Sequence, residues 1–221
     1  MFTGIIQAIG TLSSMERSGA DMCLHVSTGD LRLDDVGLGD SISTNGVCLT
    51  VVALPGDGYI ADLSVETLSL STLASLRPGA RLNLEKALTL NTPLGGHLVS
   101  GHVDGIGQVL SRKQDGRSIR FEIEAPQTLA RYIAQKGSIC VDGVSLTVNA
   151  VNGSRFELNI VPHTLEKSIM SDYLTGTRVN LEVDLIARYL ERLLLADGAT
   201  VPGSGKGLTL EILARRGFLH D

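Results

Sequence analysis

The chain has 221 residues with a net charge of −5, and 43% of them are hydrophobic, which is enough for two modest cores. The acidic balance, a Trp count of zero and an aromatic content of 4% argue against a protein that follows nucleic acid backbones and stacks bases. No apolar run approaches the roughly 20 residues that span a bilayer, so we expect no membrane role either.

The N-terminal sequence and the cysteine pattern predict that the protein is located in the cytosol. Met1–Gly4 lacks the basic start and the long apolar core of a signal peptide, so we expect the chain to stay in the cytosol. Cys23, Cys48 and Cys140 are odd in number and widely spaced. This pattern fits neither a disulfide framework nor a paired-cysteine zinc site.

The sequence repeats itself with a shift of 97 positions. The longest matching blocks are Thr3–Ile6 with Ser100–Val103, Gly46–Val51 with Gly143–Val148, and Gly79–Glu85 with Gly176–Glu182. Because all of these blocks share one shift, we predict two similar domains, residues 1–97 and 98–186, followed by a helix and tail over residues 187–221.

Short strands with turns between them dominate both predicted domains. Two hairpins are predicted at matched places: Ser41–Thr44 and Val47–Val52 around Asn45-Gly46, and Ser138–Val141 and Val144–Asn149 around Asp142-Gly143. Alternating apolar residues predict further strands at Ile119/Phe121/Ile123, Phe156/Leu158/Ile160 and Val179/Leu181/Val183/Leu185. Many short antiparallel strands per domain predict an all-β fold of two small closed barrels.

Few helices are predicted. Thr128–Lys136 has apolar residues at helical spacing and precedes Gly137, a suitable C-terminal glycine. Ile186–Leu195 carries a wide apolar stripe, which suits either the packing of subunits against one another or a cap on the second barrel. Asp197–Gly207 is rich in Gly and Pro and is predicted to be a linker, and Leu208–Arg216 to be a last helix.

Three isolated motifs have simpler interpretations beside the functional ones. Pro202–Gly207 looks like a phosphate-binding loop, but Gly207 replaces the required Ser or Thr and no strand precedes it, so we predict a linker. His97 and His102 lie near Asp104, but no second ligand cluster supports a metal site, and we expect no metal. Cys48 suits a small buried residue as well as it suits a reactive thiol.

The repeat itself selects better candidates. Polar differences at otherwise matched places are where two similar domains could acquire different roles. The differing pairs are Ile5 and His102, Cys48 and Ser145, Glu66 and His163, and Ala87 and Asp184.

Several long motifs, in order, resemble the riboflavin synthase family of the alpha-chain type, a family of lumazine-binding double barrels. They are Met1–Ile6, Asn45–Val51, Gly95–Gly105, Asp142–Val148 and Pro162–Glu166. The resemblance runs from Met1 to about Leu195.

The resemblance implies two six-stranded antiparallel barrels and a C-terminal helix through which three chains assemble. It implies a dismutation of two molecules of 6,7-dimethyl-8-ribityllumazine, which yields riboflavin and 5-amino-6-(D-ribitylamino)uracil without a cofactor or metal. The sites would lie between barrels of neighbouring subunits, and lumazine synthase is a further expected partner.

The resemblance also implies the residues of two pockets. The first-barrel pocket is expected at Gly4, Ile5, Ile6, Val47, Cys48, Leu49, Asp62, Leu63, Ser64, Val65 and Glu66. The second-barrel pocket is expected at Ser100, Gly101, His102, Ser145, Leu146, Thr147, Asn159, Ile160, Val161, Pro162, His163 and Thr164, with Lys136 reaching a neighbour's site.

Roles follow from residue chemistry. We expect His102 to transfer a proton, because its unperturbed pKa of about 6.5 lies near working pH. Cys48 and Ser145 are candidate nucleophiles or polarisers, Asp184 is a candidate charge partner, and Phe2 is expected to be a lid that closes the site. Glu66 and the threonines suit the hydroxyls of the ribityl chain.

Two alternatives come from other classes of protein. A non-catalytic lumazine- or flavin-binding relative would have the same fold but would lack catalytic groups, whereas the five candidates Phe2, Cys48, His102, Ser145 and Asp184 are present here. A purely structural double-barrel adaptor would explain the repeat but not the pocket motifs.

Overall fold

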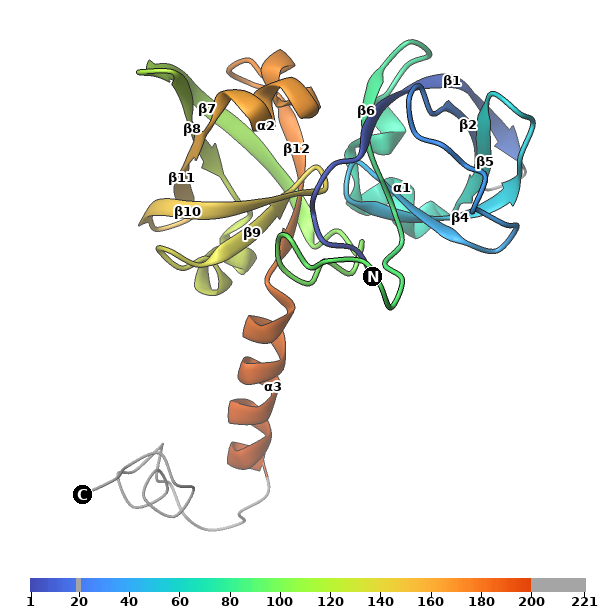
Figure 1. Cartoon of the computed structure of the whole chain (residues 1–221). Coiled ribbons are helices and arrows are strands. Elements are labelled where there is room, and N and C mark those ends of the chain that lie inside the picture. Colours follow the sequence, from blue (N-terminus) through green and yellow to red (C-terminus); the bar gives the residue numbers. More distant parts are fainter. Residues whose placement is uncertain (19–20, 200–221) are drawn as a thin grey trace. The chain divides into compact units, whose positions relative to one another are not determined.

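The computed structural model describes residues 1–18 and 21–199, which fall into two compact units, Met1–Leu185 and the segment that begins at Ile186. The first unit consists of two closed antiparallel barrels with six strands each (Figure 1). The second contains the helix α3 (Leu185–Ala199). The predicted fold class is therefore confirmed.

The two barrels have the same strand order. The first contains β1 (Ala8–Ser18), β2 (Asp21–Ser27), β3 (Ser41–Thr44), β4 (Val47–Ala53), β5 (Gly58–Leu63) and β6 (Arg81–Lys86), in the ring order β1-β2-β5-β4-β3-β6. The second contains β7 (Gly105–Asp115), β8 (Ser118–Glu124), β9 (Ser138–Val141), β10 (Val144–Asn152), β11 (Arg155–Ile160) and β12 (Arg178–Val183), in the ring order β7-β8-β11-β10-β9-β12. The repeat in the sequence is thus a repeat of topology.

Matched short helices follow the fifth strand of each barrel. They are α1 (Val65–Leu70) with the 3₁₀ turn η1 (Thr72–Ser75), and α2 (Pro162–Lys167) with η3 (Ile169–Asp172). Ser64 begins α1 by accepting a hydrogen bond from the Thr67 amide, whereas α2 begins at Pro162, whose fixed φ suits a first helical position.

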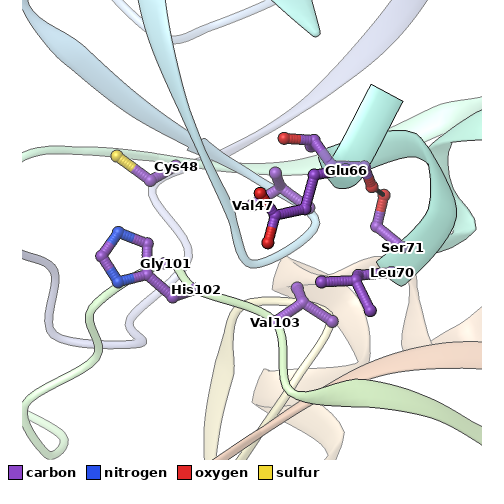
Figure 2. Close-up of a pocket in the computed structure, with 9 residues that line it drawn as sticks. Val47, Cys48, Glu66, Leu70, Ser71, Gly101, His102 and Val103 are labelled. Atoms are coloured by element: carbon purple, nitrogen blue, oxygen red, sulfur yellow. Dashed lines mark hydrogen bonds between the residues drawn. The ribbon is translucent and has the colours of Figure 1, made fainter. Parts of the chain in front are cut away.

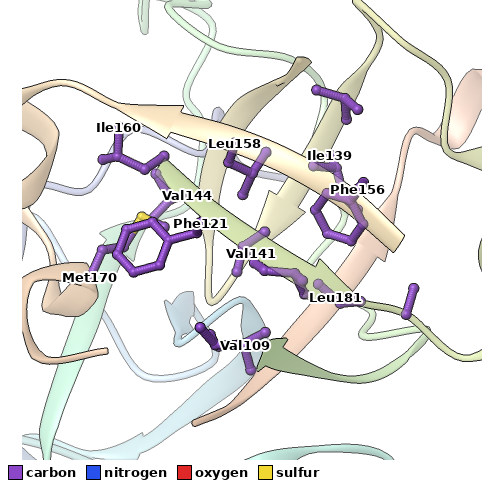
Figure 3. Close-up of a cluster of buried hydrophobic side chains, with 14 of the residues drawn as sticks. Val109, Phe121, Ile139, Val141, Val144, Phe156, Leu158, Ile160, Met170 and Leu181 are labelled. Atoms are coloured by element: carbon purple, nitrogen blue, oxygen red, sulfur yellow. The ribbon is translucent and has the colours of Figure 1, made fainter. Parts of the chain in front are cut away.

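Alternating apolar residues fill each barrel, as predicted. In the second barrel, Phe121, Phe156 and Leu158 point inward and are at most 1% exposed (Figure 3). Full burial of such a side chain contributes about 1.5–3 kcal/mol relative to its exposure. Their neighbours along each strand face outward, which is why these strands alternate in the sequence.

One helix prediction was wrong. Residues 128–136 form no α-helix: a 3₁₀ turn, η2 (Gln127–Tyr132), follows Pro126, and its hydrogen bonds run from Leu129 to Pro126 and from Ile133 to Ala130. The left-handed residue after it is Lys136, with a φ of 67°, and not Gly137. Leu129 and Ile133 are buried nonetheless, so the apolar spacing marked core residues in a tighter turn.

The end of the chain was predicted only in part. The helix predicted over Ile186–Leu195 is confirmed and extends to Ala199, so the predicted linker begins too early. The rest of that linker, with Pro202–Gly207, and the predicted helix Leu208–Arg216 lie outside the described residues. Within residues 1–18 and 21–199, no helix combines the length and the apolarity that a membrane crossing requires.

The two predicted hairpin turns meet tip to tip between the barrels. Asn45 and Gly46, like Asp142 and Gly143, all have positive φ, as a type I′ turn requires. A Cβ atom on Gly46 would lie 2.7 Å from the amide nitrogen of Gly143, and one on Gly143 would lie 2.9 Å from that of Gly46. Glycine is therefore needed for the turns and for their close approach.

Two buried asparagines at matched places join the barrels. Asn83 donates from Nδ2 to the Asp142 carbonyl and accepts from the Ile169 amide, both at 2.8 Å. Asn180 donates to the Asn45 carbonyl at 2.8 Å and accepts from the Thr72 amide at 2.7 Å. Each barrel thus satisfies backbone groups of the other.

Replacing Asn180 with alanine is expected to lower the free energy of unfolding by about 2–4 kcal/mol, because two buried backbone groups lose their partner. Urea unfolding followed by circular dichroism measures the loss. Asn152→Ala, at an exposed position at the end of β10, serves as the matched control and should change stability by less than about 0.5 kcal/mol. Equal effects of the two variants would contradict the joining role of Asn180.

Asp142 places a buried carboxylate where the first barrel has the neutral Asn45. It accepts hydrogen bonds from the Asn180 amide and the Tyr173 hydroxyl. Burial raises the pKa of Asp142 to about 7, against the lowering effect of these two donors. The folded chain therefore holds this proton more tightly than the unfolded chain, and stability from this group falls as pH rises from about 4 to about 7.

Asp142→Asn is expected to remove that part of the pH dependence. The shift from 3.8 to about 7 corresponds to at most about 4 kcal/mol, so the difference in unfolding free energy between wild type and variant should change by up to this amount between pH 4 and pH 7. Urea unfolding across this pH range measures it. A difference that stays constant with pH would contradict the raised pKa.

Candidate active site

Each barrel carries one pocket at its short helix. Pocket 1, of about 290 Å³, is lined by Val47, Cys48, Glu66, Thr67, Leu70, Ser71, Gly101, His102 and Val103. Pocket 2, of about 140 Å³, is lined by Gly4, Ile5, Ile6, Val144, Ser145, His163, Thr164, Lys167 and Ser168. Every residue of pocket 1 has its counterpart, 97 positions away, in pocket 2.

The chemistry of the two pockets differs at these matched places. Figure 2 shows the Cys48 thiol and the His102 ring on one side of pocket 1, with Glu66 and Leu70 across from them. Their counterparts in pocket 2 are Ser145, Ile5, His163 and Lys167. At these four places, pocket 1 thus carries a thiol, an imidazole, a carboxylate and an apolar side chain, while pocket 2 carries a hydroxyl, an apolar side chain, an imidazole and an ammonium group. The Leu70/Lys167 difference was missed in the sequence, although the shift of 97 could have found it.

Each pocket is completed by a segment that precedes the other barrel in the sequence. The Cys48 amide donates to the Gly101 carbonyl, and the Ser145 amide donates to the Gly4 carbonyl, both at 2.8 Å. The predicted grouping was therefore wrong: Gly4–Ile6 lie in pocket 2 with Ser145, and Gly101 and His102 lie in pocket 1 with Cys48. The physical reason is that each segment docks on the hairpin of the other barrel before its own barrel begins.

Two buried glutamates hold these segments in place. Glu182 accepts from the Ser100 amide at 2.6 Å, from its hydroxyl at 2.7 Å and from the Gly101 amide at 2.9 Å. Glu85 accepts the same three bonds from Thr3 and Gly4. Burial raises the pKa of both carboxyls, and the donated hydrogen bonds counteract it in part.

Phe2 is an anchor and not the predicted lid. Its side chain is fully buried against Val99 and Cys140, with Cys48 and Ala87 packed beside them. Its backbone forms a bridge to Val99 in both directions, at 2.7 and 3.1 Å. Phe2 therefore ties the start of the chain to the segment at Val99. Because its ring is fully buried, it is not free to close over a pocket.

Several predicted site residues line neither pocket. Leu49, Leu63 and Ile160 belong to the barrel cores. Asp62, Ser64, Val65, Ser100, Lys136, Leu146, Thr147, Asn159, Val161 and Pro162 are not among the lining residues, although Ser64 and Pro162 start the helices that supply them. Asp184 also lines neither pocket, but it lies close enough to act electrostatically on His97.

His97 contacts Ser145, a role that the sequence did not predict. Its spacing from His102 suggests only a shared metal site, yet the two histidines lie in different places: His102 lines pocket 1, and His97 Nδ1 lies 2.6 Å from the Ser145 hydroxyl oxygen. Burial lowers the pKa of His97, and the charge of Asp184 counteracts this in part. Over the described residues, no group of three His, Cys, Asp or Glu side chains could hold a metal ion.

Comparisons with known proteins agree with the double-barrel architecture. A family model described as "Lumazine binding domain" matches residues 3–87 and 100–184, one match per barrel. The chain is similar to the riboflavin synthase of Photobacterium phosphoreum, with 48% identity over 219 residues that cover 99% of this chain and 100% of that one. The riboflavin synthase of Bacillus subtilis is 36% identical over 218 residues, with the same coverage. These alignments continue beyond Leu195, where the resemblance was expected to end.

Solved structures extend the comparison to three dimensions. The crystal structure of LumP complexed with riboflavin superposes with a TM-score of 0.77 at 23% identity, covering 83% of this chain and 99% of that one. The complex of LumP with 6,7-dimethyl-8-(1'-D-ribityl) lumazine gives a TM-score of 0.75 at 22% identity, with the same coverage. At these identities the match establishes the fold.

Proposed function

The chain belongs to the riboflavin synthase family, and we propose that its two pockets hold the two molecules of 6,7-dimethyl-8-ribityllumazine that this reaction consumes. Riboflavin synthases transfer a four-carbon unit from one molecule to the other, giving riboflavin and 5-amino-6-(D-ribitylamino)uracil. The observation that carries the proposal is that nine matched pairs of residues line the two pockets, with different chemistry at four of the pairs. Two equal substrates therefore meet unequal surroundings.

Juxtaposition is the main catalytic effect in this proposal. Holding two reactants in the right geometry can lower a barrier by about 7–11 kcal/mol. The C7 methyl group of the lumazine is acidic, so a weak base suffices to form its carbanion. A nucleophile, water or a side chain such as Ser145 or Cys48, adds at C7 of the partner molecule and prepares it for attack.

His102 is the proposed proton-transfer group. Its exposed side chain lies in pocket 1 next to Cys48, and its amide donates to the Ser100 hydroxyl, which fixes the backbone. Glu66 and Thr67 in pocket 1, and Thr164 in pocket 2, offer acceptors and donors to the ribityl hydroxyls.

His102→Gln is expected to lower kcat by about 100-fold or more while riboflavin still binds, because a positioned proton-transfer group typically contributes this much. Steady-state turnover and fluorescence titration separate the two quantities. His25→Gln, a histidine paired with Asp57 outside both pockets, is the matched control. Full turnover in His102→Gln would remove the assigned role.

We propose that three chains assemble, with a reaction site between pockets of neighbouring subunits. The apolar stripe of α3 supports this, since Tyr189, Leu190 and Leu193 are 63%, 55% and 66% exposed in the single chain. Lys136 lines neither pocket of its own chain, as a side chain that reaches into a neighbour's site would. Analytical ultracentrifugation of wild type and Leu190→Asp tests the assembly: wild type should sediment at three times the chain mass, and the variant below it.

The test of the function is incubation of the purified chain with the lumazine. Appearance of riboflavin fluorescence, with release of the pyrimidine product in equal amount, supports the synthase. Tight binding of an unchanged ligand would instead favour a non-catalytic binding protein of this fold, and neither binding nor turnover would favour a structural adaptor. Location in the cytosol and association with lumazine synthase remain predictions.

A further inference from the structure

The hydroxyl of Ser145 is contacted by the half-buried side chain of His97. Ser145 lines pocket 2, its amide is fixed by the Gly4 carbonyl at 2.8 Å, and its hydroxyl oxygen lies 2.6 Å from His97 Nδ1. A Cβ atom on Gly96 would lie 2.8 Å from this hydroxyl oxygen and 2.2 Å from the Thr3 carbonyl oxygen. Glycine before His97 therefore lets the backbone bring the imidazole this close.

The surroundings of His97 determine where its proton lies. Nε2 is buried and has no hydrogen-bond partner in the part of the chain that the structure describes. Burial also lowers the pKa of this imidazole, so the neutral form is favoured. A proton on Nε2 would be a buried N–H without an acceptor, which is rarer in proteins than a buried acceptor without a donor. The proton of the neutral ring therefore belongs on Nδ1, facing Ser145.

The neutral ring and the lack of an acceptor at Nε2 together determine the direction of the hydrogen bond between His97 and Ser145. With the proton on Nδ1, the imidazole donates to Ser145 Oγ, and the hydroxyl proton is left to point elsewhere. A general-base role for His97 is disfavoured by the same geometry, because taking the hydroxyl proton would leave a charged, half-buried ring whose buried Nε2–H has no acceptor.

We propose that His97 is a positioning residue, which donates to Ser145 Oγ and so directs the Ser145 hydroxyl as a hydrogen-bond donor to a carbonyl oxygen or ring nitrogen of the molecule in pocket 2. The inference depends on the proposed binding of a lumazine or flavin ring there. Cys48, at the matched place in pocket 1, carries a thiol, which is a weaker donor than a hydroxyl. His97 therefore makes pocket 2 the better site for a ring rich in acceptors.

The experiment measures riboflavin affinity in pocket 2 alone, by fluorescence titration in a Leu70→Trp background whose indole fills pocket 1. His97→Phe retains a ring but loses the donor, and should weaken binding about 3- to 10-fold, as expected for one hydrogen bond. His97→Asn retains an N–H at the same place and should recover most of the affinity. In a chain that also carries Ser145→Ala, His97→Phe should have no further effect. His25→Phe is the matched control.

Nitrogen-15 NMR of the ring in wild type gives an independent readout that needs no variant: the proton should be found on Nδ1 at neutral pH. A proton on Nε2, an unchanged affinity in His97→Phe, or an equal loss with and without Ser145 would each overturn the inference. Failure of the wild-type chain to bind riboflavin or to turn over the lumazine would instead count against the proposed function.

Discussion

Replacing Gly101 with alanine is expected to lower the free energy of unfolding by about 2–5 kcal/mol and turnover by about 100-fold. Gly101 has a φ of +81°, and a Cβ atom there would lie 2.6 Å from Cys48 Cβ, 2.9 Å from a ring carbon of Phe2 and 3.0 Å from the Cys48 amide nitrogen. None of these neighbours can yield, because Phe2 is fully buried and the Cys48 amide donates to Gly101 itself. The segment that carries His102 would be pushed out of pocket 1.

Gly79→Ala separates the two causes. Gly79 also has a positive φ, +91°, but nothing lies within 4 Å of an added Cβ atom. It should lose only the strain of the left-handed backbone, about 1–2 kcal/mol, and keep full turnover. Urea unfolding and the riboflavin assay compare the two variants. Equal losses would show that close packing of the segment on Cys48 is unimportant.

Much of the fold could be predicted because the signals are local. The Asn45-Gly46 and Asp142-Gly143 turns need positive φ wherever they occur, and alternation at Phe121 and Phe156 depends only on the strand itself. The shift of 97 residues then made each half a check on the other. The spacing of the apolar residues Leu129 and Ile133 suits a 3₁₀ turn as well as an α-helix, so this spacing alone could not distinguish the two.

The composition of the pockets could not be predicted in the same way. Gly4 and Gly101 are recognisable as matched glycines, but nothing local tells which hairpin a segment docks on. That choice depends on reciprocal contacts between the barrels, and the repeat makes the two choices look equivalent in the sequence. The hydrogen bond of His97 to Ser145 spans 48 residues and has no counterpart in the first half, so the comparison of halves could not find it.

The segment before each barrel docks on the hairpin of the other barrel, and we call this the crossed arrangement. Glu85 and Glu182 offer the sharpest test of it. Both oxygens of the Glu182 carboxylate accept, Oε1 from the Ser100 amide and hydroxyl, and Oε2 from the Gly101 amide. An amide in its place presents one acceptor and one donor, so at least one N–H or O–H of the segment would face another donor. Because hydrogen bonds to a charged group are worth about 1.5–3 kcal/mol each, Glu182→Gln should cost about 2–4 kcal/mol of stability.

The crossed arrangement also predicts which pocket each variant impairs. Glu182→Gln loosens Ser100–Gly101 and should weaken riboflavin binding in pocket 1 by about 10-fold, although Glu182 lies in the second barrel. Glu85→Gln, in the first barrel, should do the same to pocket 2. Lys167→Trp and Leu70→Trp backgrounds, which fill pocket 2 and pocket 1 respectively, allow each affinity to be read alone, with the exposed Glu16→Gln as control. If each glutamate affected the pocket of its own barrel instead, the segments would dock uncrossed in solution.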